Sequence, residues 1–273
     1  MAYKLIAIDM DDTLLTDDLV IPAHVKQAIR MAAAQGVRVV LCTGRTIKST
    51  KRYYDELGLD TLCITAGGAE VYDADGHAVF TRDVDPPLVK QVLEFAYEKD
   101  LHAQVYINGE LVYRDKNRFA EEYEIPYGFP GILEPDLLSR PEIITPKVLL
   151  IMDADKLPAV KEEAEKRFKT LTIKRSKPIY LEFAHPSVDK GEALAFVANY
   201  YGIDSRDVIA VGDADIDIPM LKYAGLGVAM ANASPAVQQA ADVVCSSNQQ
   251  GGIADVIKEY ILEASYEDHA QDR

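Results

Sequence analysis

Three short polar segments carry side chains whose types and spacing could bind a cation or act on a substrate. Asp9 and Asp11 follow one apolar run, residues 43–45 (TGR) follow a second, and residues 212–217 (GDADID) follow a third. Carboxylates that crowd together are costly unless a cation neutralises them. Oxygen ligands with no His or Cys nearby favour Mg²⁺ over zinc or copper. The segments therefore predict a magnesium site if the fold brings them together.

Ordinary structural roles compete with this interpretation. An Asp at the end of a strand commonly caps the following helix or begins a turn. The spacing of Asp9 and Asp11 occurs six times in the chain, so it carries little weight alone. We interpret the pair 73/75 as the turn of a hairpin and the pair 153/155 as a helix cap. Only Asp9 is also followed by a threonine four residues later, Thr13.

Other chemical motifs are missing from the sequence. It contains no phosphate-binding loop of the form GxxxxGK[ST], no GxSxG nucleophile elbow and no HExxH zinc motif. Gly67 and Gly68 lack the spaced third glycine of a dinucleotide-binding fingerprint. A calcium loop starting at Asp213 would need Gly and Glu where the chain has Ile218 and Ala224. Hydride transfer, metalloprotease chemistry and an EF-hand are therefore disfavoured.

Charge and composition narrow the class of partner. The chain has 29 Lys and Arg against 44 Asp and Glu, a net charge of −15. Such a surface repels nucleic-acid phosphates and anionic lipid, so we expect neither nucleic-acid nor membrane binding. A local cation can still admit a small phosphorylated molecule. The 48% apolar and 27% charged residues indicate a globular protein.

Cysteine use and the N-terminal segment suggest the compartment. Cys42, Cys63 and Cys245 are too scattered for a disulfide framework or a thiolate zinc site. The apolar run at residues 5–8 is too short for a signal peptide, and no run reaches the length of a membrane span. We therefore expect a cytoplasmic protein.

Alternating strands and helices are predicted at both ends of the chain, and they would position the polar segments. Short apolar runs predict strands, and helical spacing with glycine stops predicts helices. The predicted strands are 5–8, 37–42, 62–65, 208–211, 228–229 and 243–244, and the predicted helices are 22–36, 47–57, 190–201, 219–223 and 252–264. This order is typical of a parallel α/β sheet, in which the carboxyl ends of the strands form the ligand-binding edge.

The middle of the chain has a different pattern. After a hairpin around residues 73–76, it mixes helices and hairpins as an α+β module does. The predicted elements are a helix at 88–99, a hairpin at 104–113 around Asn108-Gly109, a Pro- and Gly-bearing stretch at 126–146, a strand at 148–152, a helix at 158–168 and strands at 171–173 and 180–183. The predicted fold is a Rossmann-like parallel-sheet core, residues 1–84 and 186–273, with an inserted α+β domain, residues 85–185.

Four segments in order resemble the motifs of the haloacid dehalogenase-like phosphohydrolases, specifically the Cof-type group with a large C2-type cap domain. The motifs are residues 8–15 (IDMDDTLL), residues 41–45 (LCTGR), Lys190 with Gly191, and Gly212-Asp213 with Asp217. The likeness runs nearly end to end and includes the insertion of about a hundred residues, which corresponds to the cap of this family.

Three positions depart from the family pattern. The family commonly has Asn where this chain has Ile216 and Gly67, and frequently has Gly where it has Asp12. Ile216 cannot donate the side-chain hydrogen bond that this Asn usually makes near the phosphate. Gly67 replaces an Asn that usually lies near the cap. We expect Asp12 to leave the metal site intact.

The resemblance implies hydrolysis of small phosphomonoesters, often sugar phosphates, through an aspartyl-phosphate. Asp9 would attack phosphorus as the nucleophile. Asp11 would protonate the leaving oxygen and then deprotonate the attacking water. Asp9, Asp213 and the backbone carbonyl of Asp11 would hold Mg²⁺, which offsets the repulsion between these acids and the phosphate.

The same resemblance assigns the phosphate contacts. Thr43 and Gly44 would bind the phosphate, Thr43 through a hydrogen bond. Lys190 would stabilise the equatorial oxygens and restrain the nucleophile. Asp217 would support Lys190 or a metal-bound water, or would only begin a helix. Arg45 is left open as a surface or structural cation.

The cap is expected to close over the core, exclude water and contact the leaving group. Two other functions stay open: a phosphomutase that passes the phosphate to a second hydroxyl, and a regulatory protein that binds a phosphate ligand without turnover. A receiver-like phosphoacceptor is disfavoured because it needs no insertion of this size. Neither the physiological substrate nor an oligomeric state is specified by the sequence.

Overall fold

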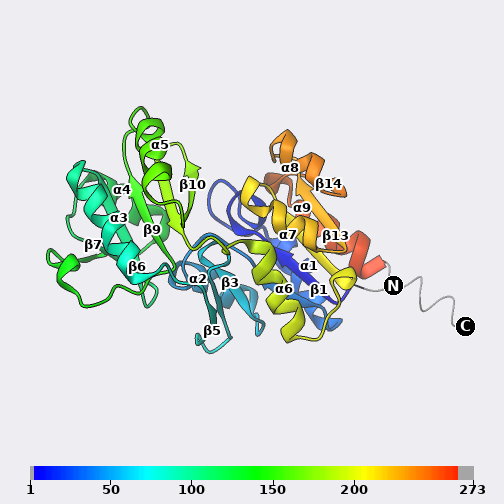
Figure 1. Cartoon of the computed structure of the whole chain (residues 1–273). Coiled ribbons are helices and arrows are strands. Elements are labelled where there is room, and N and C mark those ends of the chain that lie inside the picture. Colours follow the sequence, from blue (N-terminus) through cyan, green and yellow to red (C-terminus); the bar gives the residue numbers. More distant parts are fainter. Residues whose placement is uncertain (1–2, 264–273) are drawn as a thin grey trace, which may run out of the picture. The chain divides into compact units, whose positions relative to one another are not determined.

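The structure is a computed structural model, and it describes residues 3–263. The chain forms two compact units (Figure 1). The first contains the residues up to Arg45, Thr50–Val79 and the residues from Asp189 onwards, and the second contains Thr46–Ser49 and Phe80–Val188. The predicted end of the last helix, Ala264, lies outside the described residues.

A five-stranded parallel sheet forms the centre of the first unit. Its order is β14-β13-β12-β1-β2, and every neighbouring pair is parallel. The strands are β1 (Leu5–Ile8), β2 (Arg38–Leu41), β12 (Val208–Gly212), β13 (Leu226–Met230) and β14 (Val243–Cys245). All four residues of β1 are buried, as expected for the continuous apolar run of a strand covered on both faces.

Helices and short turns complete the first unit. They are α1 (Ala23–Ala34), α6 (Lys190–Tyr200), α7 (Ile218–Tyr223), α8 (Pro235–Ala240), α9 (Gly252–Ile257) and the part of α2 (Ile47–Leu57) that begins at Thr50. Buried residues of α1 and α9, such as Ile29 of α1, share one core with residues of the sheet that include Ile6 and Ile8 of β1. The predicted last helix is α-helical only to Ile257, after which Lys258–Glu263 forms a wider π-helical turn.

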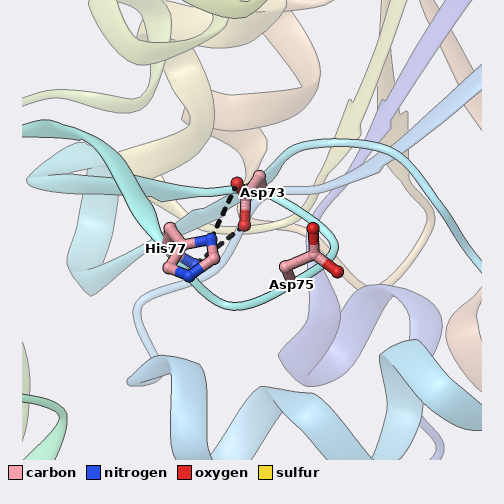
Figure 2. Close-up of side chains that lie close together, drawn as sticks. All are labelled: Asp73, Asp75 and His77. Atoms are coloured by element: carbon pink, nitrogen blue, oxygen red, sulfur yellow. Dashed lines mark hydrogen bonds and ion pairs between the residues drawn. The ribbon is translucent and has the colours of Figure 1, made fainter.

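A small sheet, β3 (Cys63–Thr65), β4 (Glu70–Tyr72) and β5 (Ala78–Thr81), contains the predicted hairpin. Figure 2 shows its turn, where Asp73 accepts hydrogen bonds from the His77 backbone nitrogen at 2.8 Å and from the ring Nδ1 at 3.4 Å, with Asp75 nearby. Asp75 and His77 are exposed, and the backbone bond from Gly76 to Asp73 closes the turn. The interpretation of the pair 73/75 as turn residues is confirmed.

The second unit is built on a six-stranded sheet of order β10-β11-β9-β6-β7-β8, in which only the β7–β8 pair is parallel. Its strands are β6 (His102–Ile107), β7 (Glu110–Tyr113), β8 (Ile132–Leu133), β9 (Lys147–Ile151), β10 (Thr172–Lys177) and β11 (Tyr180–Ala184), and its helices are α3 (Pro86–Glu98), α4 (Arg118–Tyr127) and α5 (Leu157–Arg167). Helices α3 and α5 bury one face of the sheet.

Two sequence predictions for this unit are wrong. Helix α4 and strand β8 occupy a stretch for which we predicted no element. Asn117 caps α4 by accepting from the Phe119 backbone nitrogen at 3.0 Å, and Gly128 ends it in the left-handed conformation. The pair 153/155 does not cap α5, because that helix follows Lys156 without a side-chain cap and Asp153 instead pairs with Arg118.

The architecture confirms the predicted fold class, a parallel-sheet core with an inserted α+β domain. The strongest turn signal of the insertion also forms. Asn108 and Gly109 both have positive φ, 52° and 76°, as the central residues of a type I′ hairpin turn require. Within residues 3–263, no helix has the length and apolar character that crossing a bilayer would need.

Candidate active site

The carboxyl ends of three neighbouring strands bring the predicted polar segments together. Asp9 follows β1, Asp213 follows β12, and Thr43 lies just beyond β2. The Asp9 backbone nitrogen donates to the carbonyl oxygen of Val211 in β12 at 3.0 Å. A hydrogen bond of the sheet therefore joins the segment after β1 to the strand that leads to Asp213. The edge that the strand pattern predicted is therefore the edge where the acids lie.

A buried group of carboxylates surrounds one lysine at this edge. Oxygen atoms of Asp9, Asp213 and Asp217 lie within 4.8 Å of one another. Nζ of Lys190 donates to Asp9 and to Asp217 at 2.5 Å each, and its side chain is only 1% exposed. Asp217, which the sequence placed in a supporting role, thus shares its partner with the predicted nucleophile.

The electrostatics of this group are those of crowded, partly desolvated carboxylates. Burial would lower the pKa of Lys190, but the carboxylates of Asp217 and Asp9 outweigh burial and raise it. Burial and Asp217 raise the pKa of Asp9 against the opposing effect of Lys190. Burial also raises the pKa of Asp213 to about 6. Three carboxylates around one ammonium leave an excess of negative charge on hard oxygen ligands, which suits Mg²⁺.

Asp217 is held by backbone as well as by Lys190. Its Oδ2 accepts from the backbone nitrogens of Asp213 and Ala214 at 3.1 and 2.9 Å, and the residue directly precedes α7. The sequence left open whether it only begins a helix or also supports the lysine. It does both.

Gly212 leaves no room for a side chain beside Asp217. A Cβ atom built on Gly212 would lie 2.6 Å from Cβ of Asp217, closer than real contacts allow. We expect Gly212→Ala to displace Asp217 and to lower the free energy of unfolding by about 1–3 kcal/mol, the usual cost of overpacking. Urea denaturation followed by circular dichroism measures this, and an unchanged midpoint would contradict the tight packing.

The loop after Asp9 has an unusual backbone. Residues Met10–Leu14 form a turn in which Asp12 has φ 58°, a left-handed conformation that Gly and, less readily, Asp adopt. This is the position where the resembled family frequently has Gly. Oγ1 of Thr13 donates to Oδ1 of Asp213 at 2.7 Å, so the loop also fixes a carboxylate of the cluster.

Asp11 is oriented by Arg45 and lies outside the carboxylate cluster. Nε and Nη2 of Arg45 donate to the two carboxylate oxygens of Asp11 at 2.9 and 2.6 Å. The Arg45 side chain is 4% exposed and that of Asp11 is 49% exposed. The sequence did not predict this pair. The sequence contains one hint of the pair. Arg45 directly follows Thr43 and Gly44 at the end of one predicted strand, and Asp11 lies at the end of the predicted strand before it.

Thr43 and Gly44 form the turn between these groups. The Thr43 side chain is buried, and its Oγ1 accepts from the Arg45 backbone nitrogen at 3.1 Å. The Thr43 carbonyl accepts from Gly67 at 2.9 Å. Gly67 has φ 72°, and Asn is among the few other residues that tolerate this conformation. Gly67 adopts this conformation without steric cost.

Comparisons with known proteins place this arrangement in a family. The sequence model of the haloacid dehalogenase-like hydrolases matches residues 6–257. YxeH of Bacillus subtilis, which is named provisionally as a phosphatase, is 35% identical over 95% of this chain and 99% of its own. The 5-amino-6-(5-phospho-D-ribitylamino)uracil phosphatase YcsE of the same organism is 31% identical over 95% of this chain and 96% of its own.

A solved structure has the same fold. The crystal structure of a haloacid dehalogenase-like hydrolase from Bacteroides thetaiotaomicron superposes with a TM-score of 0.88 at 28% identity, covering 94% of this chain and 99% of that one. The likeness extends over nearly the whole of both chains.

Proposed function

The chain belongs to the haloacid dehalogenase-like hydrolases, and from this and its site we propose that it is a Mg²⁺-dependent phosphatase of small phosphomonoesters, with sugar phosphates as the main class. The observation that carries the proposal is the buried group in which Lys190 bridges Asp9 and Asp217 beside Asp213. Such a group offers a nucleophile, a cation site and a fixed positive charge at one strand edge.

In the first step the Asp9 carboxylate attacks phosphorus. A bond forms between its oxygen and phosphorus, and the bond from phosphorus to the leaving-group oxygen breaks. Asp11 would give a proton to that oxygen, so the leaving group departs as a neutral alcohol while the phosphoryl group stays on Asp9. Lys190 holds the Asp9 carboxylate by a 2.5 Å hydrogen bond and places positive charge where the phosphoryl group is transferred.

In the second step water hydrolyses the aspartyl-phosphate. Asp11, now a carboxylate, takes a proton from the water as the oxygen of that water attacks phosphorus. Inorganic phosphate leaves and the Asp9 carboxylate is restored. Asp9 and Asp213 would hold Mg²⁺, with the Asp11 carbonyl as a further ligand, and the ion would neutralise the carboxylates and the phosphate. Thr43 would donate a hydrogen bond to a phosphate oxygen.

Two observations support a small polyhydroxy substrate. The net charge of −15 opposes binding of polyanions such as nucleic acid. The relative YcsE is named for a phosphate ester of a ribityl group, an open-chain sugar alcohol, and it aligns with 95% of this chain. We therefore extend the proposed class to phosphorylated sugar alcohols.

Phosphate release from a substrate panel tests the proposed function. The panel contains sugar phosphates, a pentitol phosphate, nucleotides and an aryl phosphate, each with Mg²⁺ and with a chelator. We expect Mg²⁺-dependent release that is fastest with the sugar-type esters. Release that survives the chelator contradicts the metal requirement. Isomerised sugar phosphate without free phosphate indicates a phosphomutase, and binding without turnover indicates a regulatory protein.

Arg45→Lys tests the role given to Asp11. Lysine keeps the charge but cannot reproduce the two parallel hydrogen bonds of the guanidinium. We expect kcat to fall by about 10–100-fold because a general acid that is poorly placed transfers its proton slowly. Steady-state kinetics with the aryl phosphate and with a sugar phosphate measure this. The first step alone determines kcat/KM, and the aryl leaving group needs little protonation there, so an equal loss of kcat/KM for both substrates would contradict the role of Asp11 as general acid.

A further inference from the structure

We infer that Asn232 and Asn248 are positioning residues that fix the loop after the nucleophile, Met10–Leu15, in its active conformation. The inference rests on the proposed phosphatase function. Both side chains come from segments more than two hundred residues away in the sequence, and each donates a hydrogen bond to a backbone carbonyl of this loop. Neither residue was singled out by the sequence motifs.

Asn232 holds the middle of the loop. It follows β13 and its Nδ2 donates to the carbonyl oxygen of Asp12 at 2.8 Å. Asp12 is the loop residue with φ 58°, so the bond fixes the peptide group that follows a left-handed residue. If Asp12 relaxed to negative φ, its carbonyl oxygen would turn away from the Asn232 side chain. Asn232 therefore stabilises the less favourable backbone conformation.

Asn248 holds the end of the loop and also orients Asn232. Its buried side chain donates from Nδ2 to the carbonyl oxygen of Leu15 at 3.0 Å. Its backbone nitrogen donates to Oδ1 of Asn232 at 3.1 Å. The amide of Asn232 is thereby oriented with its nitrogen toward Asp12. The two residues form one connected support for two carbonyls of the loop.

The supported segment contains the groups that the reaction needs. Asp11 immediately precedes Asp12, and Thr13 immediately follows it and donates to Asp213 at 2.7 Å. A change in the peptide group between Asp12 and Thr13 would move both neighbours. Because displacements of about 1 Å can cost about 100-fold in rate, a loosened loop would slow catalysis without any change in the reacting side chains.

The test uses the full-length variants Asn232→Ala and Asn248→Ala, with Asn199→Ala, on the exposed side of α6, as the matched control. Kinetics with an aryl phosphate separate kcat from KM, and hydrogen exchange measures protection of the amides in residues 10–15. We expect kcat to fall by about 10–100-fold in each variant with KM changed less than about threefold. We also expect faster exchange in residues 10–15, and neither change in the control.

The double variant strengthens the test. Because both residues hold one loop, the losses in kcat should be clearly less than multiplicative. A kcat within twofold of wild type in Asn232→Ala, or unchanged exchange of residues 10–15 in both variants, overturns the inference. If wild type releases no phosphate, the proposed function fails, and the exchange measurement alone then decides whether the two asparagines hold the loop. Asn232 is exposed, so its variant is expected to fold even if the Asn248 variant does not.

Discussion

Asp9→Asn is expected to lower kcat by about 10⁴-fold or more, because an amide has neither the nucleophilic oxygen nor the charge of the carboxylate. The Asp9 side chain is buried against Lys190 just after β1. Because asparagine has nearly the same size and shape as aspartate, the replacement keeps the shape of the site. Phosphate release with the best substrate of the panel measures the loss.

The matched control for this variant is Asp75→Asn. Asp75 belongs to another Asp-x-Asp pair, but it lies exposed in the turn between β4 and β5. Its replacement should leave kcat unchanged. Turnover of Asp9→Asn close to the wild-type rate would show that another group attacks phosphorus and would remove the basis of the proposed mechanism.

Lys190→Met is expected to lower the free energy of unfolding by about 3–5 kcal/mol, the usual cost of removing one partner from a buried ionic group. Methionine fills a similar volume, so the loss reports on charge more than on packing. Removing the ammonium leaves Asp9 and Asp217 without their shared donor, and both are buried. We also expect phosphate release to be abolished at detectable levels.

Chemical denaturation in the presence of a chelator measures this loss of stability. The control is Lys222→Met, because Lys222 is exposed on α7 and should contribute little. A Lys190→Met protein as stable as wild type would show that the carboxylates are not held as a charged group. Added Mg²⁺ should recover part of the stability if the cation occupies the same cluster.

The core of the fold and the position of the site could be predicted because both follow from local patterns. The apolar run Leu5–Ile8 and its counterparts predict buried parallel strands, and parallel strands present their carboxyl ends at one edge. That geometry alone brings Asp9 and Asp213 together, as the structure shows. No side-chain detail is needed for this inference.

The insertion was harder to predict where local signals conflict. Pro126 lies within α4, and proline usually argues against a helix interior. Strand β8 has only two residues, Ile132 and Leu133, too few to show a period. Helix α8 of the core has six residues and was missed for the same reason.

Side-chain partners were the least predictable part of the site. The Arg45–Asp11 pair and the Asn232 bond to Asp12 join residues on different strand ends, and the spacing along the chain contains no information about them. By contrast, two departures from the family pattern become clear from the backbone. Asp12 and Gly67 both have positive φ, which Gly adopts most readily and Asn and Asp more readily than most other residues.

The most direct test of the proposed mechanism is to trap the intermediate. The enzyme is mixed with substrate and Mg²⁺, quenched in acid during turnover, digested and mapped by mass spectrometry. We predict that one phosphoryl group is found on the peptide containing Asp9, and that Asp9→Asn carries none. Turnover with the phosphoryl group on another residue, or with no labelled peptide at any quench time, would contradict covalent catalysis by Asp9.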